Sequence, residues 1–203
     1  MNNLIAFEGI DGSGKSTQIS LLLSKLSKKN IEYSIYREPG GDPLSEKVRE
    51  ILLDKSMEIV DEAETMLFLA ARAQLTAKGI LPDLEKNKLV ICDRFCDSTL
   101  VYQGYGKSMN KDLIKRCNMF VTRQTNPRMT IIMDIDYKTS LLRMGKNRDR
   151  MEENSNIFFE SVINGYKELA LESPEKYFIV NGTYPEEEIH NLIWNKIKKE
   201  FNL

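Results

Sequence analysis

Histidine is almost absent from this chain, and cysteine is scarce. His190 is the only histidine among 203 residues, and one remote imidazole makes a Ser/His/Asp or Cys/His hydrolase hard to assemble. We expect His190 to lie on the surface of a C-terminal amphipathic helix. The three cysteines are an odd number, which does not suggest a disulfide framework. Cys92 and Cys96 have no histidine or third cysteine near them, which argues against a zinc site.

The chain also has almost no net charge and no long apolar runs. Its 29 basic and 30 acidic residues leave a formal charge of −1, so no basic surface for a nucleic acid polymer is expected. No apolar run approaches the roughly 18–20 residues of a membrane span. The N-terminus begins almost directly with a strand, which leaves no room for a signal peptide. We therefore expect a cytoplasmic protein of one domain, residues 1–203, with a sizeable core.

What the chain does contain is an alternation of short apolar runs and helical patterns. Five unalternating apolar runs separated by helices predict an α/β fold, with a five-stranded parallel sheet and helices on both faces. Ligands should then bind outside the carboxyl ends of the strands. The expected strands are Leu4–Phe7, Tyr33–Tyr36, Leu89–Cys92, Thr130–Met133 and Tyr177–Val180. The expected helices are Lys15–Lys28, Pro43–Leu53, Glu62–Glu85 with Pro82 kinking or ending it, Ser98–Gln103, Lys111–Arg123, Lys138–Met144, Asn156–Leu171 and Glu186–Glu200.

The first strand and the first helix are joined by a phosphate-binding loop of the pattern GxxxxGK[ST]. Glycines let several backbone N–H groups face one anion, and the helix N-terminus adds a partial positive charge. Lys15 can reach the β- and γ-phosphates of a nucleoside triphosphate, and the Ser16 hydroxyl can ligate Mg²⁺. Strand, loop and helix in this order favour a functional loop over a chance glycine-rich turn. The loop residues are Gly9, Ile10, Asp11, Gly12, Ser13, Gly14, Lys15, Ser16 and Thr17.

Asp93 and Arg94 directly follow the third expected strand. In a protein with this loop, an acidic residue at a strand end is placed to hold Mg²⁺ directly or through water. The arginine beside it offers a fork of donors suited to a second phosphate. The alternative is a surface ion pair in an ordinary turn, but a strand-end position is what this phosphate chemistry requires.

Two further patterns leave their alternatives open. The segment 143–153 has four basic residues within Arg143–Arg150; it is either a basic lid over a transferring phosphoryl group or a solvated charged turn. Phe68 and Arg72, four apart, share a helix face. They could stack on a base and bond its edge, although core packing is the commoner role of such an aromatic residue.

With these segments in view, the chain resembles bacterial thymidylate kinases over essentially its whole length. The Arg-Glu-Pro-Gly-Gly loop together with Asp93-Arg94-Phe95 and Tyr102-Gln103-Gly104 is quite specific to that family, whereas the phosphate loop is not. The matching segments are 7–17, 37–41, 67–72, 93–95, 97–99, 102–104 and Asp149-Arg150.

The resemblance implies a P-loop nucleoside monophosphate kinase fold with a short lid, and transfer of the ATP γ-phosphoryl to dTMP, giving dTDP and ADP. It implies Mg²⁺ with ATP, held through Ser16 and Asp93, and a homodimer. The loop residues named above and Arg143 are expected to bind ATP. Phe68 would stack on thymine, and Tyr102 would crowd the sugar 2′ position. The dTMP residues implied are Asp11, Glu38, Pro39, Arg49, Phe68, Arg72, Arg94, Ser98, Thr99, Tyr102 and Gln103.

The family has two variants, one with an arginine inside the phosphate loop and one that supplies it from the lid. This chain has Asp11-Gly12-Ser13 in the loop, so it resembles the second. The resemblance accordingly implies that Lys15, Arg94, Arg148, Arg150 and Asp11 are the catalytic residues, with the lid arginine that meets the γ-phosphoryl left undecided.

Three alternatives stay open. A deoxynucleoside kinase would need a carboxylate base and fewer cations at the acceptor, which Arg37, Arg49 and Arg94 disfavour. Another monophosphate such as dUMP differs from dTMP by one methyl group, which gives only about 1–3 kcal/mol of discrimination. A non-catalytic nucleotide-binding protein would keep the phosphate loop but lack an acceptor pocket.

Overall fold

The computed structural model describes residues 3–144 and 149–203. The described residues form a five-stranded sheet with every neighbouring pair parallel, as the sequence predicted. The strand order, β2-β3-β1-β4-β5, was not predicted. Each expected strand is present and extends by one or two residues. The strands are β1 Leu4–Glu8, β2 Tyr33–Arg37, β3 Leu89–Asp93, β4 Met129–Asp134 and β5 Tyr177–Asn181.

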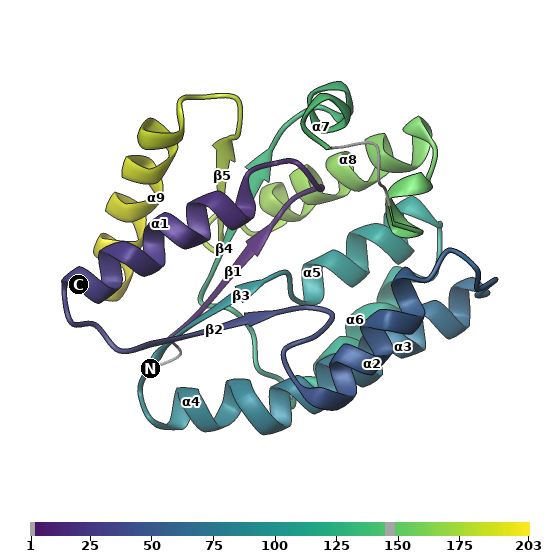
Figure 1. Ribbon diagram of the computed structural model, residues 1–203, viewed down its shortest axis with the longest axis horizontal. Coiled ribbons are helices and arrows are strands. Elements are labelled where there is room, and N and C mark those ends of the chain that lie inside the picture. Colours follow the sequence, from purple (N-terminus) through teal and green to yellow (C-terminus); the bar gives the residue numbers. More distant parts are fainter. Residues whose placement is uncertain (1–2, 145–148) are drawn as a thin grey trace.

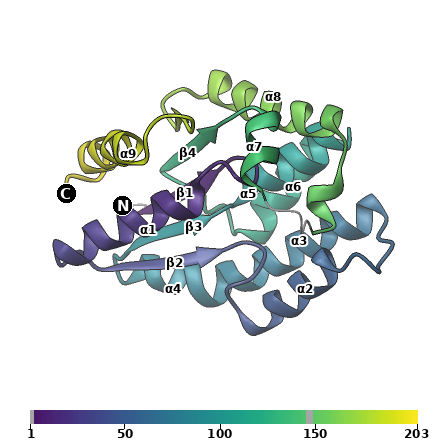
Figure 2. The same ribbon diagram turned by 45° about the horizontal axis from the view of Figure 1, so that its top comes forward.

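Helices cover both faces of this sheet (Figure 1). Helices α1 and α9 pack on each other and on the strands at one face, while α4 and α8 lie against the other. Helices α2, α3 and α6 lie side by side at one end of the molecule in both views (Figures 1 and 2). The α-helices are α1 Lys15–Lys28, α2 Pro43–Leu53, α3 Asp61–Leu75, α4 Leu81–Glu85, α5 Cys96–Thr99, α6 Lys111–Val121, α7 Tyr137–Arg143, α8 Asn156–Glu172 and α9 Glu186–Phe201.

The core lies on both sides of the sheet because successive strand residues point to opposite faces. In β1, Ile5 and Phe7 pack with residues of α1 and α9, while Leu4 and Ala6 pack with Leu75 of α3 and its neighbours. All four side chains are fully buried. Each large one stabilises the fold by about 1.5–3 kcal/mol, and this burial fixes the strand end from which the phosphate loop departs.

Two expected helices have wider turns than predicted. The pattern over 62–85 forms α3, a π-helical stretch η1 at Thr76–Ile80, and α4, with Pro82 in the first turn of α4. The expected helix at 98–103 begins earlier as α5 and continues as a second π-helical stretch, η2, at Leu100–Gly106. Hydrophobic spacing does not separate α from π turns, so only the structure shows where the widened turns place Tyr102 and Gln103.

His190 lies on the C-terminal helix, as expected, but it is only partly at the surface. Its side chain is half-buried, and burial, with Lys25 nearby, lowers its pKa. The reason is its place on α9 beside Ile189, at the edge of the helix face that packs on the sheet.

Among the helices the structure describes, none has the length and apolar character that crossing a membrane requires.

Candidate active site

The phosphate loop turns tightly between β1 and α1. Gly9, Gly12 and Gly14 have φ values of 133°, 73° and 96°, where L side chains are strained. A Cβ at Gly9 would lie 2.6 Å from the Met133 carbonyl oxygen of β4. Glycine is therefore required both by the backbone conformation and by the close approach of the neighbouring strand.

Lys15 is held inside this loop. Its Nζ donates to the carbonyl oxygens of Gly9 and Ile10, both at 2.9 Å. Burial, together with the nearby Arg94 cation, lowers the pKa of Lys15 to about 8. An anionic phosphate in the loop would favour the charged amine again, because an opposite charge at close range stabilises it. The loop is thus prepared for an anion.

The cavity at the loop has a volume of about 790 Å³. Loop residues 11–17, Asp93 and Arg94 line it, while Gly9 and Ile10 contribute the carbonyl groups that hold Lys15. Arg143 also lines it and donates to the carbonyls of Gly12 (3.3 Å) and Gly182 (3.0 Å). The side chains expected around ATP therefore meet at one place.

Arg94 has a left-handed backbone conformation, with φ of 71°. Such a conformation costs energy for a non-glycine residue and often occurs at functional sites. Here it turns the guanidinium back over the phosphate loop, where it donates to the Gly9 carbonyl (3.0 Å) and to Asp11 Oδ1 (2.6 Å). Burial opposes ionisation of Asp11, but the Arg94 and Lys15 cations outweigh it and lower the pKa of that carboxyl.

Glu8 fixes the segment that follows Arg94, and sequence reasoning missed it. This fully buried carboxylate accepts from the backbone N–H groups of Phe95 (2.8 Å) and Ser98 (3.2 Å). It also accepts from the hydroxyls of Ser98 (2.6 Å) and Tyr166 (2.8 Å). Burial and the neighbouring Asp97 raise the pKa of Glu8 to about 7. The available signal was an acidic residue at the end of a buried strand.

The expected magnesium ligands fit the chemistry of that ion. Ser16 and Asp93 both line the phosphate cavity, and neither side chain makes a hydrogen bond or salt bridge within the described ranges. Among those residues no group of three or more His, Cys, Asp or Glu could hold a metal. A magnesium ion that keeps waters and phosphate oxygens as ligands needs only one or two protein oxygens.

A second cavity, of about 90 Å³, adjoins the first. Asp11, Glu38, Arg49 and Arg94 line both cavities, so the two meet at a pair of arginines. Leu53, Asp149 and Met151 also line the second cavity and were not expected. Every residue expected around dTMP lines it: Asp11, Glu38, Pro39, Arg49, Phe68, Arg72, Arg94, Ser98, Thr99, Tyr102 and Gln103.

Arg72 lies at the wall of this second cavity, but every nitrogen of its guanidinium bonds to protein. Nε donates to Glu38 Oε2 (2.7 Å), and Nη1 donates to Thr99 Oγ1 (2.8 Å) and Asn118 Oδ1 (2.7 Å). Nη2 donates to the Phe95 carbonyl (2.9 Å). In this structure Arg72 therefore acts first as the support that joins α3, α5 and α6 to the loop of Glu38.

The loop that contains Glu38 has a buried carboxylate oxygen without a hydrogen-bond partner among the described residues. Glu38 is 4 % exposed, and burial raises its pKa in spite of the Arg72 cation. Its Oε1 is buried without a hydrogen-bond partner among the described residues. Arg49 donates to the Pro39 carbonyl (3.0 Å), and Glu46 accepts from the Gly41 N–H (2.7 Å) and from Arg37 (2.9 Å). These bonds hold the loop against the shared arginines.

The expected lid arginines differ in their placement. Arg143 reaches the phosphate cavity, as described, and Arg148 lies outside the described residues. Arg150 does not line that cavity; it donates to the Leu52 carbonyl (2.8 Å) and to Glu64 Oε2 (2.6 Å). Its contact with a transferring phosphoryl group stays a prediction.

Gly182 and Tyr184 also line the phosphate cavity and were not predicted. They follow β5, whose carboxyl end lies at the same edge of the sheet as those of β1 and β3. The rule that ligands bind at this edge was the signal that could have found them.

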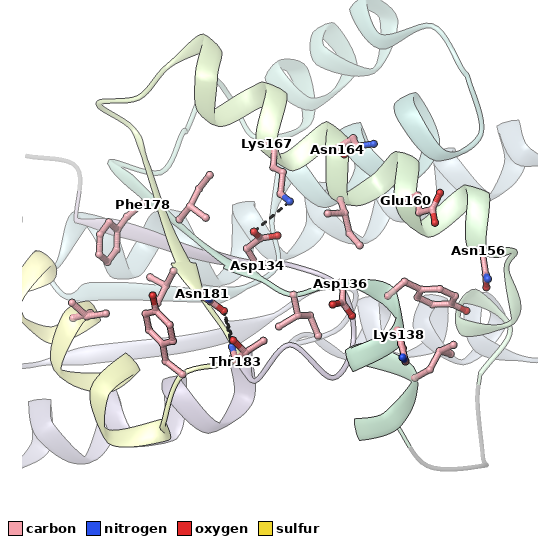
Figure 3. Close-up of a pocket in the computed structure, with 18 residues that line it drawn as sticks. Asp134, Asp136, Lys138, Asn156, Glu160, Asn164, Lys167, Phe178, Asn181 and Thr183 are labelled. Atoms are coloured by element: carbon pink, nitrogen blue, oxygen red, sulfur yellow. Dashed lines mark hydrogen bonds and ion pairs between the residues drawn. The ribbon is translucent and has the colours of Figure 1, made fainter.

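A hollow larger than the cavity at the phosphate loop, of about 1300 Å³, lies along β5 and between α7, α8 and α9 (Figure 3). Several of its polar groups are already paired within the protein. Lys167 pairs with Asp134 at 3.4 Å, Asp136 caps α7 through the Thr139 N–H, and Asn181 accepts from Thr183. No residue of the phosphate loop lines this hollow. The volume of a cavity therefore does not identify the active site of this protein, whereas the phosphate-binding groups that line the smaller cavity do.

Two adjoining cavities that share a pair of arginines suit a reaction between two phosphorylated ligands. Together with the parallel sheet and the phosphate loop, they define a P-loop phosphotransferase of the nucleoside monophosphate kinase class. The family profile described as Thymidylate kinase matches residues 7–193. This chain belongs to the thymidylate kinase family.

Individual relatives agree with that assignment. A thymidylate kinase of Kosmotoga olearia is 41% identical over 201 residues, which cover 98% of this chain and 95% of the relative. One of Fervidobacterium nodosum is 42% identical over 199 residues, 98% of each chain. The crystal structure of thymidylate kinase from Ehrlichia chaffeensis matches with a TM-score of 0.80 and 34% identity, covering 96% of this chain and 97% of that one.

Proposed function

We propose that this chain transfers the γ-phosphoryl group of Mg²⁺-ATP to dTMP, giving dTDP and ADP. ATP would occupy the cavity at the phosphate loop and dTMP the adjoining one. The observation that carries the proposal is that both cavities share Arg49 and Arg94. Cations at that junction would cancel the repulsion between the donor and acceptor phosphates, which is the main obstacle to this reaction.

Each residue then has a specific task. Lys15 and the loop N–H groups would bind the β- and γ-phosphates, and Ser16 and Asp93 would hold Mg²⁺, which neutralises charge on the phosphates. Arg94 would contact both phosphates, since its guanidinium lies above the loop and lines both cavities. Phe68 and Tyr102 would hold the thymine base and the deoxyribose.

A deoxynucleoside kinase is disfavoured by the same geometry. Its acceptor is an uncharged hydroxyl that must lose a proton to a carboxylate base. Asp11 is bound by Arg94, and Glu38 by Arg72, so both carboxylates that line the junction are engaged by arginines. An ionised acceptor phosphate needs no such base.

The first test measures ADP release with Mg²⁺-ATP and dTMP, dUMP, dCMP, dGMP, dAMP, UMP or thymidine as acceptors. We expect turnover with dTMP at least tenfold above the other monophosphates, none with thymidine, and loss of turnover when EDTA removes Mg²⁺, restored by added Mg²⁺. Turnover with thymidine would move the chain to the nucleoside kinases. ATP binding without turnover on any acceptor would leave only a nucleotide-binding domain.

We also propose a homodimer, formed through the outer face of α2, α3 and α6. These neighbouring helices expose large apolar side chains that isolated monomers rarely gather in one place. Phe120 is 84% exposed. The others are Leu44 and Ile51 on α2, Met66 on α3, and Leu113 and Met119 on α6.

Replacing Phe120 by glutamate should shift the protein from dimer to monomer, because a carboxylate would be buried without a partner in an apolar interface. Light scattering coupled to gel filtration reads the mass directly. Leu171→Glu, on α8 and also exposed (81 %), is the matched control and should leave the mass unchanged. A Phe120→Glu protein that stays dimeric would place the interface on another face.

A cytoplasmic location completes the proposal. Cys92, Cys96 and Cys117 are all free thiols, as expected in a reducing compartment. Fractionation of cells that express the protein would test it.

A further inference from the structure

A buried carboxylate outside the expected site, Glu64, joins three parts of the molecule. It lies on α3, one turn before Phe68, and is fully buried. Its Oε1 accepts from Gln103 Nε2 (2.9 Å) and Lys107 Nζ (2.7 Å). Its Oε2 accepts from Arg150 Nη2 (2.6 Å). The cavity of about 90 Å³, in which we place dTMP, is called the acceptor cavity below. The Glu64 carboxylate thus links Gln103, Lys107 and Arg150 to α3, the helix whose Phe68 and Arg72 line that cavity.

The contact with Gln103 determines which way that amide faces. A carboxylate paired with two cations only accepts hydrogen bonds, so the amide must turn its NH₂ group toward Glu64. The carbonyl oxygen, Oε1, then lies on the other side. It accepts no hydrogen bond within residues 3–144 and 149–203, and the Gln103 side chain, though 1 % exposed, lines the acceptor cavity.

The cavity therefore presents a hydrogen-bond acceptor at this position. Thymine and uracil carry a donor, N3–H, on the ring edge that bases use for pairing, whereas cytosine carries an unprotonated acceptor nitrogen there. The neighbouring Arg72 has no uncommitted nitrogen to read that edge, because each one bonds to protein. The orientation of the Gln103 amide then contributes to the discrimination between these rings.

We propose that Glu64 is a specificity-determining positioning residue of the acceptor site. By holding Gln103 with its oxygen toward the cavity, it selects pyrimidine monophosphates that have a ring N3–H and rejects cytosine monophosphates. This inference rests on the proposed placement of dTMP in that cavity. Neutralising Lys107 does not require Glu64, since Asp61 pairs with the same amine at 2.7 Å.

The experiment compares kcat/KM for dTMP, dUMP and dCMP in the wild type and in Glu64→Gln. A glutamine at 64 can donate as well as accept, so the Gln103 amide is free to reverse. We expect the ratio of dTMP to dCMP to fall at least tenfold, since a site built around a hydrogen bond discriminates strongly. The ratio of dTMP to dUMP and the KM for ATP should stay unchanged. An equal loss on all three acceptors would mean a merely structural role and would overturn the proposal.

Two further variants keep the test decisive. Glu62→Gln, on the same helix and exposed, should leave all ratios at the wild-type values. Glu64→Asp keeps the negative charge for Lys107 and Arg150 but is one methylene shorter. It should fold if Glu64→Gln does not, and it should lower the dTMP to dCMP ratio in the same direction.

A double-mutant cycle tests whether Glu64 changes the dTMP to dCMP ratio through Gln103. In a Gln103→Leu background, Glu64→Gln should not change the dTMP to dCMP ratio any further, because the amide it orients is gone. A ratio that still changes would show that Glu64 acts otherwise. Wild-type protein without turnover of dTMP would refute the proposed function itself, whereas active wild type with an unchanged ratio in Glu64→Gln refutes only the role of Glu64.

Discussion

Replacing Arg94 by alanine is expected to lower kcat on dTMP by about 10²–10³-fold or more. Removing a single donor that stabilises transition-state charge has about this effect in other enzymes, and arginines in phosphoryl transfer often contribute more. Arg49 also lines both cavities, but it donates to the Pro39 carbonyl, whereas Arg94 donates to Gly9 and Asp11 of the phosphate loop. Steady-state kinetics of ADP release, with each substrate varied, measures the effect.

The control must account for the backbone. Arg94 has a left-handed conformation, and alanine there carries similar strain. Arg123 is exposed and also left-handed, with φ of 51°, so Arg123→Ala makes the same change of residue type and backbone conformation away from the cavities. It should retain wild-type kcat. If Arg94→Ala raised only the KM for dTMP, Arg94 would bind the acceptor without stabilising the transition state.

Arg72→Ala should have the largest effect on stability. Arg72 and Glu38 are 2 % and 4 % exposed and are 2.6 Å apart, and breaking a buried pair by removing one partner costs about 3–5 kcal/mol. That is a large part of the roughly 5–15 kcal/mol by which domains are stable. The variant should also raise the KM for dTMP more than the KM for ATP. Urea unfolding and two-substrate kinetics measure both effects.

The pH dependence of that loss follows from Glu38. Burial raises the pKa of Glu38, and without the Arg72 cation the pKa would rise further. A group whose folded-state pKa is raised favours folding when protonated, so the deficit of Arg72→Ala should shrink as pH falls from 8 toward 5. Adding Glu38→Gln to Arg72→Ala should restore part of the stability at pH 8. A deficit that is independent of pH would mean that lost packing, not the unpaired carboxylate, causes it.

The sequence alone predicted the sheet, because five buried apolar runs separated by amphipathic helices are compatible with few other folds. It also predicted the phosphate loop, since the glycines at 9, 12 and 14 and the lysine at 15 act through local backbone geometry. Every residue expected around dTMP lines the acceptor cavity. Those residues were found through a family resemblance; their spacing in the chain does not reveal the cavity.

What the sequence could not show were partners far apart in the chain. Glu8 bonds to Tyr166, 158 positions later, and Glu64 bonds to Arg150, 86 positions later. Nothing local distinguishes these buried carboxylates from exposed ones until the strands and helices are packed.

The sequence by itself determined which groups can bind phosphate, because a phosphate loop depends on neighbours a few residues apart. Tertiary structure decided which groups are free to act. It committed the nitrogens of Arg72 to protein acceptors, paired Arg150 with Glu64, and brought Arg94 to the junction of two cavities. Hydrogen bonds between distant segments form only when packing excludes water around them, and that condition is a property of the whole fold.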